Sequence, residues 1–336
     1  MLDLQRLERI RLSSNPIGQK IVGTLLLAPN YTFLPGVDIE VEDFERVPDE
    51  PVIYAMNHPD RYNYWPFQYR LWRDHDRFTS TWVKGKYYEN ELLGKFMELT
   101  NNIPTVSRGY LIARDFKAVC GRPPETDEYR ALRDTIDVAA GLAEESEAPD
   151  NLRRAVPSAV LDAPRDTLGR FYDAESESYA TYINSLFEMM MSRFVDINVD
   201  AFEEGLDLLI FPQGTRSIRL LRGRIGLAQI ALYLKKTVVP VGCNGSEKVY
   251  PGNSPVAQEG HIVYRVGEPI RYEEMSDFHI NEDFRPFTPE AEVAHRDKFQ
   301  GFVDVVMERI NDLLDEPYQF ADDVERIGGE STRRFL

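Results

Sequence analysis

The stretch "LDLLIFPQGTRS", residues 206–217, joins a run of apolar side chains to a loop that carries Gln, Thr and Arg. Consecutive apolar residues, followed at once by a proline and a glycine, are typical of a buried strand that ends in a turn. A second stretch, "VIYAMNHPDRYN" at 52–63, repeats this form and places His58 directly after its apolar run. The sequence therefore predicts two buried strands, each followed by a loop of polar residues.

Apolar runs of strand length alternate with segments of helical periodicity along most of the chain. Strands are expected at 51–58, 78–85, 102–109, 206–211, 237–242 and 261–270. Helices are expected at 2–12, about 21–28, 64–75, 91–101, 128–145, 179–205, 223–236 and 294–316. A turn is expected at 34–40 and an irregular segment at 145–172. This alternation predicts an α/β fold with a mostly parallel central sheet flanked by helices.

The chain is expected to divide into three parts. Residues 1–45 form an N-terminal helical segment, and residues 46–275 form the α/β domain with an insertion at about 110–185. Residues 276–336 form a C-terminal helical segment that packs on the domain.

Composition excludes several classes of protein. The 336 residues carry a net charge of −17, which argues against a nucleic-acid-binding protein. Cys120 and Cys243 fit no zinc or disulfide spacing, so a reducing compartment such as the cytoplasm is expected. The apolar run at 21–28 is shorter than the roughly 20 residues that span a bilayer. No transmembrane segment is expected, and contact of this run with a membrane surface stays open.

Three expected strands end next to polar side chains. Ligands of open α/β sheets gather beyond the carboxyl ends of the strands. His58 follows the first of these strands, Arg108 the second and Arg216 the third. A histidine can accept a proton near neutral pH, and an arginine can bind a phosphate through two N–H groups. The combination suits acyl or phosphoryl transfer on an anionic substrate, although each residue also has a structural alternative at a strand end or in a surface ion pair.

Four motifs in order resemble those of the glycerolipid acyltransferases, the lysophosphatidic-acid and glycerol-3-phosphate acyltransferase family. "NHPDRYN" gives Asn57 and His58, with Asn63 where the family has Asp. "NIPTVSRG" supplies the second motif with Arg108, and "FPQGTRS" matches the third at six of seven positions, with Gln213 for Glu. "VVPVGCNG" fits the fourth, and "VKGKYY" resembles the family's lysine-bearing segment. The resemblance covers about residues 50–270, and the interval before the third motif is longer than is usual in the family.

The resemblance implies transfer of a fatty acyl group from acyl-CoA or acyl carrier protein to a hydroxyl of glycerol-3-phosphate or a lysophospholipid. His58 would be the general base, and Arg108 and Arg216 would hold the phosphate of the acceptor. The other substrate-binding residues that it implies are Lys84, Gln213, Gly214 and Thr215. No metal and no resident cofactor is expected, and the protein would touch the inner membrane face peripherally.

Two amides replace carboxylates of the family pattern, and they leave alternatives open. Asn63 stands where an acidic partner of His58 is expected, and Gln213 replaces a second carboxylate. Asp60 either supplies the missing partner of His58 or caps the helix that follows. The chain could also be a non-catalytic lipid- or acyl-binding protein of the same fold, or an acyltransferase for an acceptor without phosphate. The run Arg219, Arg222 and Arg224 is either a solvated face or a docking patch for the acyl donor.

Overall fold

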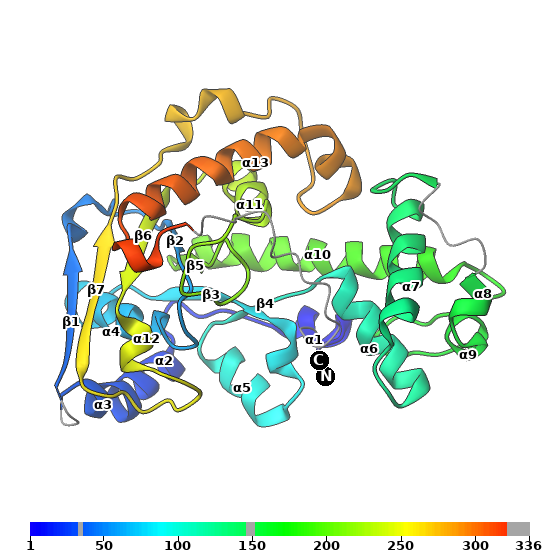
Figure 1. The fold of residues 1–336 in the computed structure, drawn as a ribbon, viewed down its shortest axis with the longest axis horizontal. Helices are drawn as coiled ribbons and strands as arrows, with labels where there is room; N and C mark the ends of the chain where they lie inside the picture. Colours follow the sequence, from blue (N-terminus) through cyan, green and yellow to red (C-terminus); the bar gives the residue numbers. More distant parts are fainter. Residues whose placement is uncertain (33–35, 146–151, 321–336) are drawn as a thin grey trace.

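The computed structural model describes residues 1–32, 36–145 and 152–320 (Figure 1). A seven-stranded sheet forms its centre, in the order β1-β7-β6-β2-β5-β3-β4. The strands are β1 (Val37–Glu42), β2 (Ile53–Met56), β3 (Thr79–Lys84), β4 (Ile103–Thr105), β5 (Asp207–Ile210), β6 (Val238–Asn244) and β7 (Gly260–Val266). Strands β2 to β6 are parallel to one another, whereas β7 is antiparallel to β6 and pairs in parallel with β1. The predicted class, a mostly parallel sheet flanked by helices, is confirmed.

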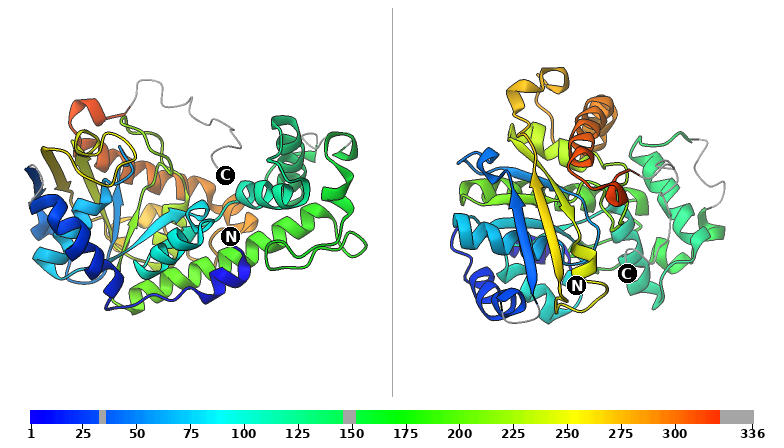
Figure 2. Two further views of the ribbon diagram at one scale, coloured as in Figure 1. Left: turned by 90° about the horizontal axis from the view of Figure 1, so that it is seen from below. Right: turned by 60° about the vertical axis from the view of Figure 1, so that its left-hand side comes forward.

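Helices cover both faces of the sheet and extend beyond it at one end. They are α1 (Leu4–Arg9), α2 (Ile17–Val22), α3 (Ala28–Thr32), α4 (Tyr64–His75), α5 (Glu91–Leu99), α6 (Arg108–Cys120), α7 (Thr126–Ala139), α8 (Leu152–Ala155), α9 (Ser158–Asp162), α10 (Tyr179–Glu203), α11 (Gly226–Leu234), α12 (Ser246–Val249) and α13 (Pro289–Asp312). A π-helical turn, η1 (Gly23–Leu27), joins α2 to α3. Figure 2 shows α10 running along the molecule from the sheet to the group α6–α9.

Alternate side chains of the central strands enter two separate cores, as the two-residue period of a strand requires. Ile53 and Ala55 of β2 face the larger core, which contains the buried side chains of α10, α11 and α13. Tyr54 and Met56 face the smaller core, which contains those of α3 and α4. The sheet is therefore buried on both sides, which explains why its central strands read as continuous apolar runs.

The structure corrects two expectations about local structure. The turn expected at 34–40 is largely strand β1, an edge strand whose residues alternate between apolar and acidic, as in "VDIEVE". The irregular segment expected at 145–172 contains α8 and α9 and a bridge between Arg165 and Tyr172. Residues 33–35, 146–151 and 321–336 lie outside the described residues. They include the first two residues of the expected turn and parts of the expected insertion and C-terminal segment.

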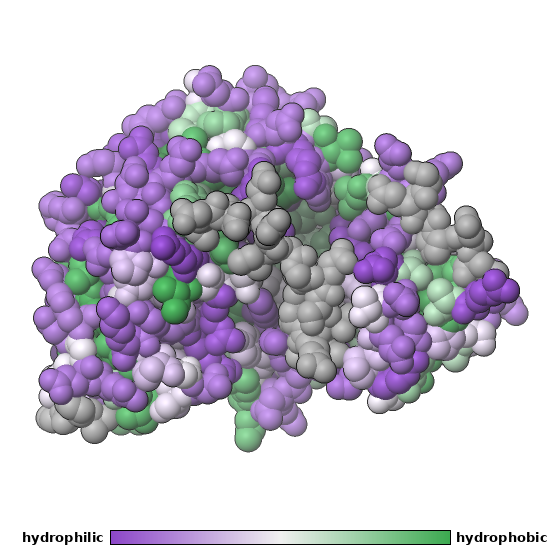
Figure 3. Space-filling model, viewed as in Figure 1, coloured by the Kyte–Doolittle hydropathy of each residue, from purple (hydrophilic) through white to green (hydrophobic). Residues whose placement is uncertain are grey.

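Helix α13 packs against β6 and α11. Among the described helices, none is long and apolar enough to cross a membrane. In the view of Figure 3, hydrophilic residues predominate and apolar ones form small separate groups.

Residues 110–185, expected from the sequence to be an insertion, contain a buried ion pair. The Asp115 carboxylate is fully buried and accepts hydrogen bonds from Arg165 Nε at 2.9 Å and Nη2 at 2.6 Å. The Thr167 hydroxyl donates to the same carboxylate at 2.6 Å. The Arg165 guanidinium also lies 4.5 Å from the centre of the Tyr172 ring. Because both charges are paired and hydrogen-bonded, they tie α6 to the segment after α9 in a fixed arrangement.

Removing the acidic partner tests this arrangement. We expect Asp115→Ala to lower the free energy of unfolding by about 3–5 kcal/mol, because it leaves the buried Arg165 charge without a partner. Urea denaturation followed by circular dichroism measures the change. Asp127→Ala is the matched control, since the Asp127 side chain is 94% exposed and lies 3.8 Å from Arg130. Equal midpoints for the two variants would contradict the structural role of the buried pair.

Candidate active site

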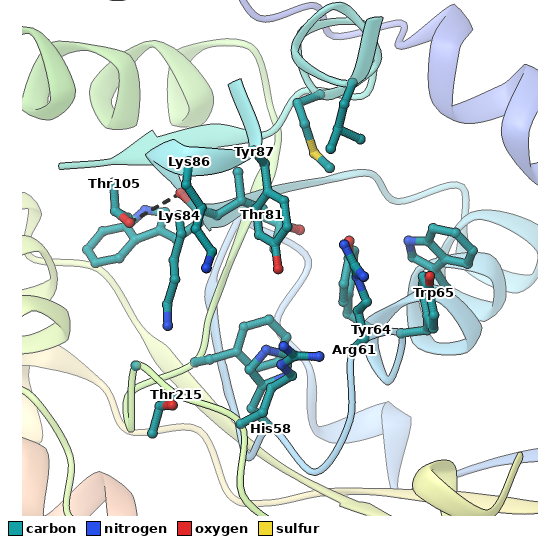
Figure 4. Close-up of a pocket in the computed structure, with 18 of the residues that line it drawn as sticks. His58, Arg61, Tyr64, Trp65, Thr81, Lys84, Lys86, Tyr87, Thr105 and Thr215 are labelled. Atoms are coloured by element: carbon teal, nitrogen blue, oxygen red, sulfur yellow. Dashed lines mark hydrogen bonds between the residues drawn. The ribbon is translucent and has the colours of Figure 1, made fainter. Parts of the chain in front are cut away.

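A cavity of about 340 Å³ opens where β2, β5 and β3 end, at neighbouring positions in the sheet (Figure 4). Its walls come from the loops after β2 and β5 and from β3 with the segment that follows it. The lining residues are His58, Arg61, Tyr62, Tyr64, Trp65, Thr81, Trp82, Val83, Lys84, Lys86, Tyr87, Leu93, Phe96, Met97, Thr105, Phe211, Gly214, Thr215 and Arg216. The cavity thus lies at the edge of the sheet where the sequence predicts the site.

His58 forms part of the cavity wall and is held from three directions. Its ring Nδ1 lies 2.8 Å from Asn63 Oδ1. The ring stacks on Phe211, with 4.1 Å between the ring centres and 16° between the planes. The carbonyl of His58 accepts a hydrogen bond from the Ser217 amide at 2.9 Å. Since Phe211 and Ser217 follow β5, these contacts join the loops after the two strands.

Asn63 is completely buried and makes further hydrogen bonds behind the histidine. Its Nδ2 donates to the backbone carbonyl of Asn57 at 3.0 Å. The backbone carbonyl of Asn63 accepts a hydrogen bond from the Tyr264 hydroxyl at 2.6 Å. The Asn57 side chain in turn donates to the Cys243 carbonyl at 2.9 Å and accepts from the Cys243 amide at 2.7 Å. The loop that carries His58 is therefore anchored to β6.

Asp60 does not fill the role of an acidic partner to His58. Its Oδ1 accepts from the Tyr62 amide at 2.6 Å, and its Oδ2 accepts from the Ser246 hydroxyl. Burial raises the pKa of Asp60 to about 6. The structure also corrects the expected helix cap, because the N-cap position of α4 belongs to Asn63, which makes no capping bond with its side chain. Asp60 shapes the turn before α4, and Asn63 is the residue that contacts the imidazole.

The surroundings of His58 favour its neutral form. Burial is the main cause that lowers its pKa to about 4, with smaller contributions in the same direction from Arg216 and Lys84. The hydrogen bond with Asn63 acts in the opposite direction and only partly offsets these effects. At neutral pH the ring is uncharged, which is the state that a general base requires.

Four cationic side chains line the cavity: Arg61, Lys84, Lys86 and Arg216. Lys84 and Arg216 were predicted from the sequence as binding residues, whereas Arg61 and Lys86 were not. Burial lowers the pKa of Lys86, and the positive charges of Arg216, Arg114 and Arg61 add to the effect. The missed residues were close to recognised ones, since Arg61 is three positions after His58 and Lys86 is two after Lys84.

Apolar and aromatic side chains share the wall with these cations, and Figure 4 shows Arg61 beside Tyr64 and Trp65. Leu93, Phe96 and Met97 of α5 line it together with Tyr64 and Trp65. A second cavity of about 40 Å³ shares Tyr64, Trp65 and Phe96 with the first and continues toward α2 and η1. The cavity therefore combines cationic and apolar side chains in one lining.

The loop after β5 has the backbone that its sequence predicts. Gly214 has φ = 67°, a left-handed conformation that disfavours other residues. Gly214, Thr215 and Arg216 all line the cavity. Gln213 is buried behind them, and its Nε2 donates to the Thr215 carbonyl at 2.8 Å, which fixes the loop.

Arg108 is not brought to the cavity, contrary to the expectation that it holds phosphate beside His58. The second motif ends in β4 at the edge of the sheet, and Arg108 begins α6 rather than lying in a loop. Its Nε donates to Asn184 Oδ1 at 2.8 Å, and its guanidinium lies 4.3 Å from the centre of the Phe187 ring. Both partners belong to α10, so Arg108 joins two helices of the structure.

Comparisons with known proteins give distant likenesses among solved structures only. No protein-family model and no curated protein matches the chain. Among solved structures, the chain is similar to the crystal structure of the 1-acyl-sn-glycerophosphate (LPA) acyltransferase PlsC from Thermotoga maritima. The two are 15% identical, the match covers 91% of this chain and 80% of the other, and the TM-score is 0.36. With a TM-score this low, the likeness decides neither the fold nor the activity of the present chain.

The titration of His58 is the first test of the site. We expect the ring to stay uncharged until the pH falls to about 4, because burial and two nearby cations disfavour the imidazolium. The unfolded chain binds this proton nearer pH 6.5, so this group makes the fold less stable as pH falls from about 6.5 to about 4. NMR titration of the imidazole, assigned with His58→Gln, measures the midpoint. A midpoint at or above 6.5 would contradict the electrostatics described here.

Proposed function

We propose that the protein is an O-acyltransferase that moves a fatty acyl group from a thioester to a hydroxyl of glycerol-3-phosphate or a lysophospholipid. One observation carries the proposal. A neutral imidazole, positioned by Asn63, lies in the wall of a cavity whose lining contains both cationic and apolar side chains. The cations suit the anionic group of an acceptor, and the apolar side chains suit a long acyl chain.

In this reaction His58 acts as general base on the acceptor. The ring nitrogen that is not bonded to Asn63 takes the hydroxyl proton while the oxygen attacks the thioester carbonyl. The new C–O bond forms, the C–S bond breaks, and the imidazolium returns the proton to the leaving thiolate. The co-substrate is acyl-CoA or an acylated carrier protein, and no covalent intermediate on the protein is required.

The cationic side chains of the cavity would bind the anionic group of the acyl acceptor. Arg216 and Lys84 line the same cavity as His58, so they are the side chains proposed to hold an anionic group of the acceptor near the base. Arg61 and Lys86 line the same cavity and enlarge the positive field. An acceptor that bears a phosphate therefore fits better than a neutral sugar or alcohol, the alternative in which the acceptor has no phosphate.

The second candidate is a binding protein of the same fold that has lost the reaction. Asn63 and Gln213 favour it, because each replaces a carboxylate of the family pattern with an amide of similar shape. Such a protein would bind acyl chains and phosphate in the same cavity but would not transfer the chain.

An acyl-transfer assay separates the two candidates. Acyl-CoA or acyl carrier protein is supplied with glycerol-3-phosphate or lysophosphatidate, and product is followed by mass spectrometry. We expect His58→Ala to lower turnover by about 10²-fold or more, since a positioned base contributes on that order. His279→Ala is the matched control, because His279 stacks on Tyr272 and does not line the cavity. Equal turnover in wild type and His58→Ala would defeat the mechanism, and no turnover in the wild type would favour the binding protein.

The N-terminal helices support peripheral contact with a membrane. Ile17, Ile21 and Leu25 are exposed by 64%, 52% and 74% and recur every four residues along α2 and η1. Residues at this spacing lie on one face of a helix. The second cavity is lined by other residues of the same helical segment, so an acceptor drawn from a bilayer would have a short path to the site.

The basic run after the third motif supports docking of the donor near the cavity. Arg219, Arg222 and Arg224 are exposed, and they follow Arg216 in the loop between β5 and α11. Arg222 forms an ion pair of 3.9 Å with Asp304, and its side chain is 62% exposed. On a chain with a net charge of −17, this group favours an acidic carrier protein or the phosphates of coenzyme A.

Binding to vesicles tests the membrane contact. We expect the double variant Ile21→Asp with Leu25→Asp to bind phosphatidylglycerol–phosphatidylcholine vesicles about tenfold more weakly or worse, because it removes apolar area that lipid would cover. Val293→Asp is the matched control, since Val293 is 63% exposed on α13. Co-sedimentation with the vesicles measures the change. The same loss in the control, or none in the double variant, would contradict the assignment of this face.

A further inference from the structure

The side chain of residue 63 lies between two groups, of which one needs a hydrogen-bond donor and the other is a ring nitrogen that can be protonated. On one side is the carbonyl oxygen of Asn57, at 3.0 Å, which can only accept a hydrogen bond. On the other side is Nδ1 of His58, at 2.8 Å. A side-chain amide is donor at one end and acceptor at the other, so it suits this position.

The position of the Asn57 carbonyl is itself fixed. The Asn57 side chain forms two hydrogen bonds with the backbone of Cys243 in β6, and all of these groups are buried. A turned amide at residue 63 would bring its oxygen against this carbonyl and leave both without a donor. The NH2 group of Asn63 therefore faces Asn57, and its oxygen faces the histidine.

This orientation decides the tautomer of His58. Because Asn63 Oδ1 can only accept, the ring must present a protonated Nδ1 to it. In a neutral ring the other nitrogen, Nε2, then carries the free lone pair. Asn63 is buried behind the ring, and His58 lines the cavity. Nε2 is therefore the ring nitrogen that can take a proton from the hydroxyl of a substrate in the cavity.

We propose that Asn63 is the native positioning residue of this site rather than a lost carboxylate, and that the Asn57 carbonyl is the reason. The inference rests on the proposed function for its meaning in catalysis. An aspartate at residue 63 would place an oxygen against the Asn57 carbonyl in a buried site, where two acceptors repel. The amide forms the network without that conflict, and it adds no negative charge.

The decisive variant is Asn63→Asp, because the two interpretations expect opposite signs. A lost carboxylate would be restored, and turnover would rise. If the amide is the native group, turnover at pH 7 falls about tenfold or more with little change in KM, because the base is misplaced after the acceptor has bound. Asn30→Asp is the matched control. Asn30 is equally buried, donates to the Pro255 carbonyl at 3.0 Å and accepts from the Ala257 amide at 2.9 Å, without lining the cavity. It is expected to lower thermal stability without lowering turnover.

A second measurement tests the amide orientation on which the inference depends, even if a variant fails to fold or the proposed activity is not found. Long-range ¹H–¹⁵N NMR of wild-type protein with labelled histidine reports which ring nitrogen carries the proton. We expect His58 at pH 7 to be protonated on Nδ1 and unprotonated on Nε2. The opposite tautomer, or a rise in turnover of Asn63→Asp, would overturn the inference. Absence of acyl transfer in the wild type would defeat the proposed function, and with it the catalytic role of Asn63. The tautomer would then still test the orientation of the amide.

Discussion

The position of β2 between β5 and β6 is the constraint on which the site depends. The loop after β2 is held from both neighbours: the Ser217 amide reaches it from the β5 side, and the backbone of Cys243 reaches it from β6. Neither attachment is local in sequence. The imidazole of His58 therefore has a defined place only when three distant segments of the chain have paired in parallel.

Much of the fold could be predicted because the sheet is covered on both faces. Central strands such as β2 and β5 read as short apolar runs, and the helices between them have a clear period. Strand β1 was missed because it lies at the edge, where acidic residues alternate with apolar ones and a Pro-Gly pair precedes it. The pattern of an edge strand is weaker, since only one of its faces needs to be apolar.

The site was predicted in part, and the errors share one cause. His58 and Arg216 meet because β2 and β5 are neighbours, whereas Arg108 follows β4, which β3 separates from β5. A sequence shows where strands end but not their order in the sheet, so it cannot tell which loops meet. Short turns hide cations for a similar reason. Lys86 lines the cavity from the 3-10 turn Gly85–Tyr88. The residue pattern of so short a turn does not show which way its side chains point.

The walls of the two adjoining cavities have one more property. The chain has three tryptophans. Trp65 and Trp82 line the larger cavity, and Trp65 and Trp72 line the smaller one. All of the tryptophan fluorescence of this protein therefore comes from side chains that line the two cavities. A ligand that occupies either cavity would change the tryptophan emission of the unlabelled protein.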